Sequence, residues 1–467
     1  MTETESLIQE IEDYCRHTDT AESTFGRRAV NDGKFVGRLR SGKSVTLKTL
    51  NRVRAFMHDH PPRGTTGGSG TLSLNAAEQS ASVESGEALP GDTATRRPFR
   101  FYDNRQKYLA FVNTCNEKVA IARRASKEIQ HIQPRPPALK IFDAGMGDAT
   151  VLSLVTRDMH RRFPNVPFFI NAKEISLEDV RLGLEKMPDR FIEHPATVLV
   201  ITNLNYSEAP KLMPGNVNAA AALNWLEVRL QGDSSYEYAE QIQALDHLLV
   251  DGWQTRTSPR TGNLQYVRPS VLVLYREDHK FLLENVIPRQ GHFDGHYDFI
   301  IASQPWRARM SAEFKARKIL KPLSLSLAPS GRLLAIQSCG NDPSQEIIER
   351  IWPGEQPFHT NRHDLLAALK HELGRDARDF NFNAGSDAKS IFRYQMHTLP
   401  SEIGSNIGTS TLFAAWNAAI YVNQTEDEKL EDAISNDRYI KATSEVLKKH
   451  KGLWFNDETF VISRKRA

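Results

Sequence analysis

The sequence predicts an α/β protein whose main domain holds a mostly parallel sheet, preceded by a small all-α domain and a flexible linker. Three observations predict this architecture. Apolar runs of strand length alternate with stretches of helical spacing between residues 139 and 463. A segment rich in Gly, Ser, Thr, Ala and Pro separates these runs from the N-terminal part. That part combines helical periodicity with concentrated basic charge.

Length and composition set the outer limits. A chain of 467 residues exceeds one ordinary domain, and with 40% hydrophobic and 25% charged residues it can form a sizeable core. The longest apolar runs are strand-sized, so no membrane insertion is expected. The first residues are acidic and lack the pattern of a secretory signal, and the three cysteines are isolated. We therefore expect a cytoplasmic protein without disulfide bonds.

Residues 1–60 are expected to form a small helical domain. Their apolar side chains first recur on one helical face, at Leu7, Ile8, Ile11, Tyr14 and Cys15. The segment 23–56 contains nine Lys or Arg against the single acid Asp32, a balance of 9 − 1 = +8, whereas the whole chain carries only +3. The rest of the chain therefore sums to 3 − 8 = −5, and the basic charge is a local feature.

This basic segment also has a turn at its middle, Asn31-Asp32-Gly33, between two short helical stretches. The arrangement resembles the helix-turn-helix domains of the phage-repressor type. The resemblance implies that a helix beginning near Lys34 enters the major groove of DNA. The side chains it places at the DNA are Lys34, Arg38, Arg40 and Lys43. The alternative is a solvated basic face on a protein-interaction domain.

The segment 61–98 is expected to be a flexible linker. It has no aromatic residue and almost no continuous apolar run. As a coil it spans roughly 35 Å root-mean-square, which lets the flanking parts move independently. The domain boundaries that follow are 1–60, 61–98 and 99–467.

The most informative motif begins at residue 139, where the strand-like run LKIFD leads into the turn Asp-Ala-Gly-Met-Gly-Asp and then into helical spacing. Gly145 and Gly147 allow a sharp turn and a close approach by a ligand. The following helix start offers free backbone N–H groups. A third glycine and a Walker lysine are both missing, so NAD and ATP are weakly supported.

Here the sequence resembles the class I S-adenosylmethionine-dependent methyltransferases, whose first motif is an acidic-x-Gly-x-Gly turn after the first strand. The resemblance implies a Rossmann-like domain with a mostly parallel seven-stranded sheet and S-adenosyl-L-methionine as the cofactor. The runs PFFINAKEIS, ATVLVITNLNYSEAP, YDFIIASQPW and GRLLAIQSCG supply the next four strands, and GLWFNDETFVISRK the final antiparallel one. The cofactor-binding residues it implies are Asp143, Gly145, Met146, Gly147, Asp148, Glu174 and Asn203. Of these, Glu174 would accept hydrogen bonds from the ribose hydroxyls and Asn203 would lie near adenine.

An insertion at 211–270 departs from the family pattern. It is expected to contain a long helical stretch from Asn216 to Trp253, and either to cover the substrate site or to form a homodimer contact. The helical spacing at 100–120 is expected to cover the cofactor cleft, and the Gly/Ser/Thr-rich loop and apolar helix at 396–422 to line its mouth.

The loop after the fourth strand bears on the methyl acceptor. Its residues Ser303, Gln304, Pro305 and Trp306 are similar to the polar-Pro-Pro-aromatic tetrapeptide of amino-directed nucleic-acid methyltransferases, in which the aromatic ring stacks on the base. Gln304 replaces the first proline. Methyl transfer needs in-line positioning more than an acid or base, and the sequence identifies no catalytic residue.

The cluster His292, Asp294, His296 and Asp298 contains residue types that can bind a metal ion. Two glycines make this segment a turn, and the histidine spacing does not place both rings on one helical face, so no metal is predicted. Three functions remain open: a methyltransferase of unknown acceptor with a DNA-binding head, a DNA or RNA amino-methyltransferase, and a transcriptional regulator that uses the fold as a ligand sensor.

Overall fold

The computed structural model describes most of the chain outside the predicted linker. The described residues are 3–17, 20–30, 32, 34–41, 49, 53–54, 56–57, 105–258, 264–404, 406–435 and 437–466. The chain divides into two compact units, Met1–Gln79 and Ser80–Ala467. The predicted linker 61–98 and Lys43 lie outside the described residues.

The first unit contains the helices α1 (Glu3–His17), α2 (Glu22–Val30) and α3 (Phe35–Arg40). They pack around a core of their own, in which Leu7, Ile11 and Phe25 are fully buried. Between α2 and α3 the chain turns at Asp32, whose backbone N–H donates to the Gly26 carbonyl over 3.0 Å. The helical character of this unit is confirmed, and its identification as a helix-turn-helix DNA-binding domain stays a prediction.

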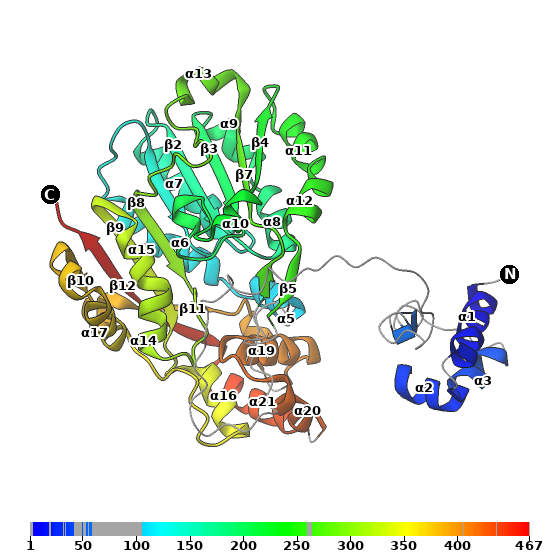
Figure 1. Cartoon of the computed structure of the whole chain (residues 1–467). Coiled ribbons are helices and arrows are strands. Elements are labelled where there is room, and N and C mark those ends of the chain that lie inside the picture. Colours follow the sequence, from blue (N-terminus) through cyan, green and yellow to red (C-terminus); the bar gives the residue numbers. More distant parts are fainter. Residues whose placement is uncertain are drawn as a thin grey trace. The chain divides into compact units, whose positions relative to one another are not determined.

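The second unit is built on a ten-stranded sheet with the order β10-β12-β9-β8-β1-β2-β3-β7-β4, and β11 also pairs with β12 (Figure 1). The strands are β1 (Leu139–Asp143), β2 (Phe168–Lys173), β3 (Thr197–Thr202), β4 (Asn224–Leu230), β7 (Ser270–Arg276), β8 (Tyr297–Ser303), β9 (Leu327–Ser338), β10 (Phe380–Asn383), β11 (Ile391–Gln395) and β12 (Trp454–Arg464). The five central strands, from β9 to β3, run parallel. Strand β12 is antiparallel to β9, and β7 is antiparallel to β3. A mixed α/β fold with a mostly parallel sheet is thus confirmed. The predicted count of seven strands is wrong: the described residues form ten, since β7 and β4 extend the sheet beyond β3 and β11 pairs with β12.

The central strands form because their sequences suit burial on both faces. Every residue of β3, with the sequence TVLVIT, is buried, and so is every residue of β7, with the sequence SVLVLYR. A strand covered on both faces needs a continuous apolar run, not an alternating one. This is why five strands could be recognised in order from the sequence.

The insertion differs from its prediction. The continuous helical stretch expected from Asn216 to Trp253 is wrong: the segment forms α10 (Val217–Ala221), strand β4, α11 (Ser235–Gln243) and α12 (Asp246–Gly252). The sequence of β4, NWLEVRL, alternates apolar and polar residues with a period of two, which favours a half-exposed edge strand. Strands β4 and β7 therefore extend the sheet beyond β3, and a small pair forms from β5 (Thr255–Thr257) and β6 (Leu264–Tyr266).

Helices cover both faces of the sheet (Figure 1). One face packs against α6 (Glu117–Ile129), α7 (Thr150–Arg162), α8 (Leu177–Leu184), α9 (Pro188–Glu193), α11 and α12. The other packs against α14 (Ala312–Lys315), the π-helical turn Ala316–Leu320, α15 (Lys321–Leu325) and α17 (Arg362–Leu373). Short helices α13 (Lys280–Leu283) and α18 (Asp387–Ser390) lie in connections. Two hydrophobic clusters thus enclose the sheet.

A third cluster joins helices from the two ends of this unit. It comprises α5 (Arg105–Thr114), α16 (Pro343–Ile351), α19 (Thr409–Val422), α20 (Asp427–Ser435) and α21 (Arg438–His450). The rings of Phe111 in α5 and Tyr421 in α19 lie 5.0 Å apart, and Asn417 donates a hydrogen bond to the Lys107 carbonyl. We call these five helices the helical layer. In the part of the chain that the structure describes, no helix is both long and apolar enough to span a bilayer.

Candidate functional site

The sheet order indicates where a ligand binds. From β1 the chain continues to β2 and β3 on one side, whereas β8 and β9 lie on the other side of β1. In open α/β sheets, ligands bind at such a switch point, outside the carboxyl ends of the strands. The turn Asp143–Asp148 follows β1 at this point, and Ser303 ends β8 beside it. The Ala144 N–H donates to the Ile301 carbonyl over 2.8 Å, which fixes the two strand ends together.

The two glycines of the turn have different roles. Gly147 has φ = +53°, a left-handed conformation that favours glycine, and a Cβ there would lie 2.9 Å from the Tyr108 hydroxyl. A Cβ on Gly145 would meet only the Ser303 carbonyl oxygen, at 3.9 Å. Gly147 is therefore required by the backbone, whereas Gly145 leaves open space in front of the turn.

Glu174 is held as an ordered carboxylate beside this turn. Its Oε2 accepts the Gly147 N–H over 2.9 Å, and its Oε1 accepts the N–H groups of Ile175 and Ser176. Its own backbone carbonyl accepts the indole N–H of Trp253 from the insertion over 2.8 Å. The predicted acid thus lies at the motif turn, and backbone donors fix its orientation.

Other acids surround the turn. Burial raises the pKa of Asp143 to about 6, although its Oδ1 accepts the Gly145 N–H, which lowers the pKa. Burial and the nearby charge of Glu174 raise the pKa of Asp179 to about 7. Burial also opposes ionisation of Asp148, but Lys118, Thr150 and Lys186 outweigh it and lower the pKa of Asp148. This end of the sheet is therefore predominantly acidic.

Helices α5 and α6 bring two further side chains to the turn. The Tyr108 hydroxyl is buried and has no hydrogen-bond partner in the described part of the chain. The Lys118 ammonium lies 5.4 Å from the Tyr108 ring centroid and 4.0 Å from where a Gly147 Cβ would be. The sequence predicted a covering helix here, but neither side chain was identified as part of the site. No local pattern marks them, because they precede the motif by more than twenty residues.

Two predicted cofactor residues make other contacts. The Met146 side chain is 3% exposed and packs beneath α8, with its Cε 2.8 Å from where a Gly183 Cβ would be. Asn203 donates both amide hydrogens, to the carbonyls of Gly252 and Arg268, and accepts the Ser270 N–H. In this structure Met146 presents only its backbone to the turn, and Asn203 ties β3 to the insertion.

The loop after β8 is packed into the protein. Gln304 has φ = +49°, and its amide binds Ser338 and Asp457. The Pro305 carbonyl accepts the hydroxyl of Tyr206 over 2.9 Å. Trp306 is only 4% exposed and donates its indole N–H to Gln337 over 2.8 Å. The ring that was expected to stack on a base is a core side chain here.

The residues predicted to contact DNA are partly engaged within the first unit. Arg38 forms an ion pair with Asp32, and Arg40 pairs with Glu12 at 2.6 Å and with Glu22 at 2.5 Å. Lys34 is exposed at the start of α3. Two of the four predicted side chains are thus already bound to acids of their own unit.

The histidine-rich turn before β8 forms other interactions. Asp298 accepts the backbone N–H of Lys140 over 2.9 Å, and Asp294 contacts the Lys140 ammonium at 3.4 Å. Among the described residues, no group of three or more His, Cys, Asp or Glu side chains is arranged to hold a metal ion.

Comparison with known proteins gives a fold-level likeness only. No protein-family model matches the sequence, and no curated protein does. One similar solved structure is a geranyl diphosphate methyltransferase in complex with GPP and sinefungin. It is 12% identical in sequence, the match covers 73% of this chain and 78% of that one, and the TM-score is 0.27. A putative sarcosine dimethylglycine methyltransferase from Galdieria sulphuraria has 11% identity, coverage of 74% and 85%, and a TM-score of 0.28. Likenesses this weak do not assign a family.

Proposed function

We propose that the unit Ser80–Ala467 binds S-adenosyl-L-methionine and transfers its methyl group to an acceptor. The observation that carries this proposal is the acidic turn at the switch point, where Glu174 is oriented by backbone N–H groups and Asp143, Asp148 and Asp179 lie close by. A sulfonium and an ammonium are cations, so this acidic environment favours them. The phosphates of ATP or NAD would be repelled by the same carboxylates.

The surrounding residues fit the remaining parts of this cofactor. Among the described residues, Glu174 Oε2 accepts a single hydrogen bond, so it has capacity for a ribose hydroxyl. The open space in front of Gly145 suits a close approach by the methionine part. Lys118 and the Tyr108 hydroxyl, which has no hydrogen-bond partner in the described ranges of the chain, supply donors for its carboxylate. These roles assign groups of the chain to the ribose and to the methionine part of the ligand.

The bound cofactor supplies the activated methyl group, and the chain's residues hold the reactants. In-line approach to a sulfonium carbon depends on positioning and on exclusion of water, so no obligatory base is needed. The helical layer and the insertion bound the site from two sides and supply this exclusion, with Trp253 bonded to the Glu174 carbonyl.

Two alternatives remain to be separated by experiment. A DNA or RNA amino-methyltransferase is less well supported, since the aromatic ring of the 303–306 loop is buried and hydrogen-bonded. A ligand-sensing regulator would bind the cofactor without transferring the methyl group. DNA binding by residues 1–60, as a head that directs either activity, is proposed from their +8 segment alone.

Thermal unfolding of the full chain tests cofactor binding. S-adenosylmethionine and S-adenosylhomocysteine should raise Tm, because each binds only the folded state, and ATP and NAD should raise it much less. Glu174→Gln places an amide N–H against the Gly147 N–H, and it should reduce the shift. Glu185→Gln, at an exposed position after α8, is the matched control.

A second measurement separates the enzyme from the sensor. Methyl-labelled cofactor is incubated with the protein and fractionated cell extract, and the fractions are counted for label. Label in one acceptor fraction supports the enzyme. A Tm shift without label in any fraction supports the sensor, and no Tm shift with either cofactor form refutes the proposal.

A further inference from the structure

A small pocket lies at the carboxyl ends of β8 and β9, one residue beyond Ser303. Its empty volume is about 240 Å³, but this value includes the open solvent at its mouth, and the space inside it is about that of one water molecule. The lining side chains come from the 303–306 loop, α14, β9 and the segments before α17 and after α19: Gln304, Trp306, Ala308, Lys315, Gln337, Ser338, Phe358, Thr360 and Gln424. Most are polar, and none of them was assigned a role in binding the cofactor.

Lys315 is the charged group of this pocket. It is 1% exposed, and its ammonium donates to the Ala308 carbonyl over 2.9 Å and to the Thr360 hydroxyl. Among the described residues, no carboxylate lies within ion-pair distance of it. Burial lowers the pKa of Lys315 to about 8. A buried ammonium without a counter-ion is unfavourable, so the free protein carries a cost at this position.

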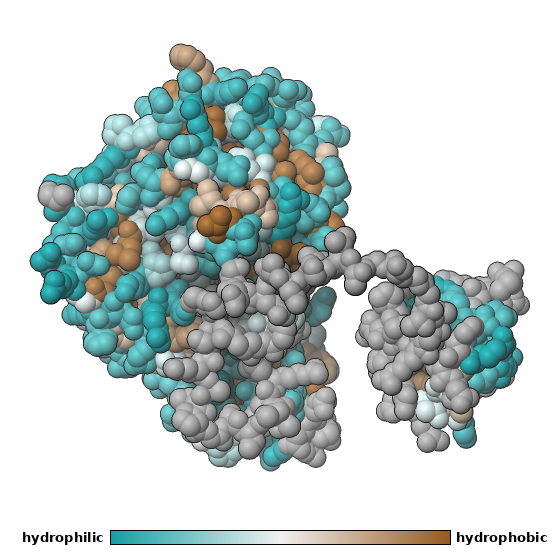
Figure 2. Space-filling model, in the orientation of Figure 1, coloured by the Kyte–Doolittle hydropathy of each residue, from teal (hydrophilic) through white to brown (hydrophobic). Residues whose placement is uncertain are grey.

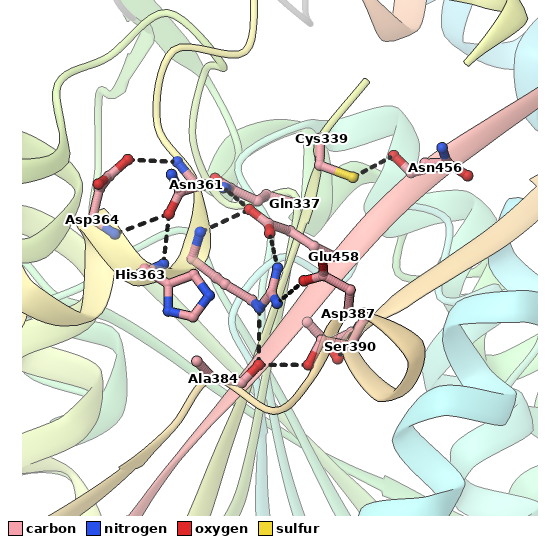
Figure 3. Close-up of polar contacts among 12 residues, drawn as sticks. Gln337, Cys339, Asn361, His363, Asp364, Ala384, Asp387, Ser390, Asn456 and Glu458 are labelled. Atoms are coloured by element: carbon pink, nitrogen blue, oxygen red, sulfur yellow. Dashed lines mark hydrogen bonds and ion pairs between the residues drawn. The ribbon is translucent and has the colours of Figure 1, made fainter. Parts of the chain in front are cut away.

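Two acids that contact the lining of this pocket are already hydrogen-bonded by other groups, as Figure 3 shows for Glu458. Glu458 Oε2 accepts the Arg362 guanidinium over 3.0 Å, and its Oε1 accepts the Arg362 N–H and the Gln337 amide. Gln337 also donates to the Thr360 carbonyl, which fixes this wall of the pocket. Asp457 accepts from Ser338 and Gln304. None of these carboxylates is available to pair with Lys315.

Two side chains of the pocket have N–H groups without an oxygen acceptor among the described residues. Two of the three hydrogens of the Lys315 ammonium are bound by neutral oxygens, and the ammonium also lies 5.8 Å from the centroid of the Trp306 ring. Gln424 accepts the Ala308 N–H on its Oε1 over 2.9 Å, which leaves its Nε2 without a hydrogen-bond acceptor among the described residues. Lys315 thus binds the carbonyl of Ala308 and Gln424 binds its N–H, and both side chains have further N–H groups near this residue. Unused donors around a positive charge call for an anionic acceptor.

We propose that this pocket binds a carboxylate, with Lys315 as its counter-ion and Gln424 as a second donor. The pocket adjoins the motif turn, since the Ser303 carbonyl lies 3.9 Å from where a Gly145 Cβ would be. The carboxylate therefore belongs to the methyl acceptor, a step that rests on the proposed function. The acceptor class is a small carboxylic acid, held so that its reactive group reaches the cofactor site.

Carboxylate binding is tested on the full chain by thermal unfolding. The probes are sodium acetate and sodium formate, compared with sodium chloride at equal ionic strength. Wild type should show a saturable rise in Tm with either probe, because both bind only the folded state. Lys315→Met keeps a long unbranched side chain without the charge and should show no rise. Lys318→Met, on the same helical segment, should respond like wild type.

A second variant guards against a folding defect in the first. Gln424→Glu keeps the oxygen that accepts the Ala308 N–H and adds a carboxylate beside Lys315. We expect it to raise Tm in chloride and to abolish the response to acetate. Its Tm in chloride should fall back when Lys315→Met is added.

The outcomes separate this pocket from the proposed function. An equal acetate response in wild type and Lys315→Met, or no response in wild type, overturns the carboxylate site even where S-adenosylmethionine still raises Tm. A Lys315-dependent acetate response without any effect of S-adenosylmethionine supports the site and removes the assignment of its ligand as a methyl acceptor.

Discussion

Replacing Gly145 by valine tests the cofactor site with little effect on the fold. A Cβ at this position meets only the Ser303 carbonyl oxygen, at 3.9 Å, and Gly145 does not adopt a left-handed conformation. The Tm of the ligand-free protein should therefore stay close to that of wild type. The branched side chain projects in front of the turn, where the cofactor approaches, so binding should be lost.

The size of the effect follows from linkage. A ligand at one hundred times its Kd adds about 2.7 kcal/mol to the free energy of unfolding. For residues 80–467, the entropy of unfolding near Tm is about 0.8 kcal/mol/K. Saturating S-adenosylmethionine should thus raise the Tm of wild type by about 3 °C, because the shift equals the added free energy divided by the entropy of unfolding. For Gly145→Val the rise should be close to zero.

Gly147→Ala is the contrasting control. Its φ of +53° is unfavourable for alanine, and the new Cβ would lie 2.9 Å from the Tyr108 hydroxyl. A strained residue of this kind costs about 1 to 3 kcal/mol, which lowers the Tm of the ligand-free protein by about 1 to 4 °C. Differential scanning calorimetry of the three proteins with and without cofactor gives both values. A wild-type cofactor shift in Gly145→Val would refute the placement of the ligand at this turn.

Three further predictions concern other parts of the chain. Trp306→Ala should destabilise the protein by about 3 to 5 kcal/mol in denaturant unfolding, because it empties a core position and leaves Gln337 Oε1 without its donor. Because this ring is buried, wild type should transfer no labelled methyl group to DNA or RNA. Burial lowers the pKa of His194 to about 4, below its ordinary value of 6.5, so on acidification the unfolded chain takes up the proton at a higher pH than the folded protein. Stability should therefore be lost as the pH falls from 6.5 to 4, and the loss should be smaller in His194→Gln. Measuring Tm as a function of pH for both proteins tests this. In gel-shift titrations the full chain should bind duplex DNA with a log-log salt slope of about −0.9 per neutralised phosphate, and Arg38→Ala should weaken binding; no retardation at low salt would contradict the DNA-binding head.

The sequence predicted the centre of the sheet and its motif turn well, and physical reasons explain this. Strands covered on both faces require continuous apolar runs, so β1, β2, β3, β8 and β9 are visible in the sequence. The positive φ of Gly147 explains one of the two motif glycines. The resemblance implied Glu174, and it lies at the turn because the carboxyl ends of neighbouring parallel strands meet at one edge.

Other features depend on contacts that no local pattern records. Tyr108 and Lys118 reach the turn only because α5 and α6 fold back over it, and the burial of Lys315 follows from the packing of α14 against the loop after β8. The sequence left base stacking by Trp306 open as one alternative, because an exposed and a buried aromatic residue look the same in sequence. The alternation in β4 was a readable signal that helical spacing in its neighbours obscured.

The helical layer has a consequence for how this protein is made. Helix α5 leaves the ribosome early, but Asn417 of α19 is 310 residues further along the chain than Lys107, the residue it binds. At about 5 to 20 residues per second, translation of that interval takes roughly 15 to 60 s. For most of this delay the apolar face around Phe111 lacks its aromatic partners, because Tyr394, Tyr421 and Phe455 have not yet been synthesised. During translation the apolar face of α5 is therefore exposed to water unless another molecule covers it. The site under Tyr108 is completed only after the last part of the polypeptide has been made.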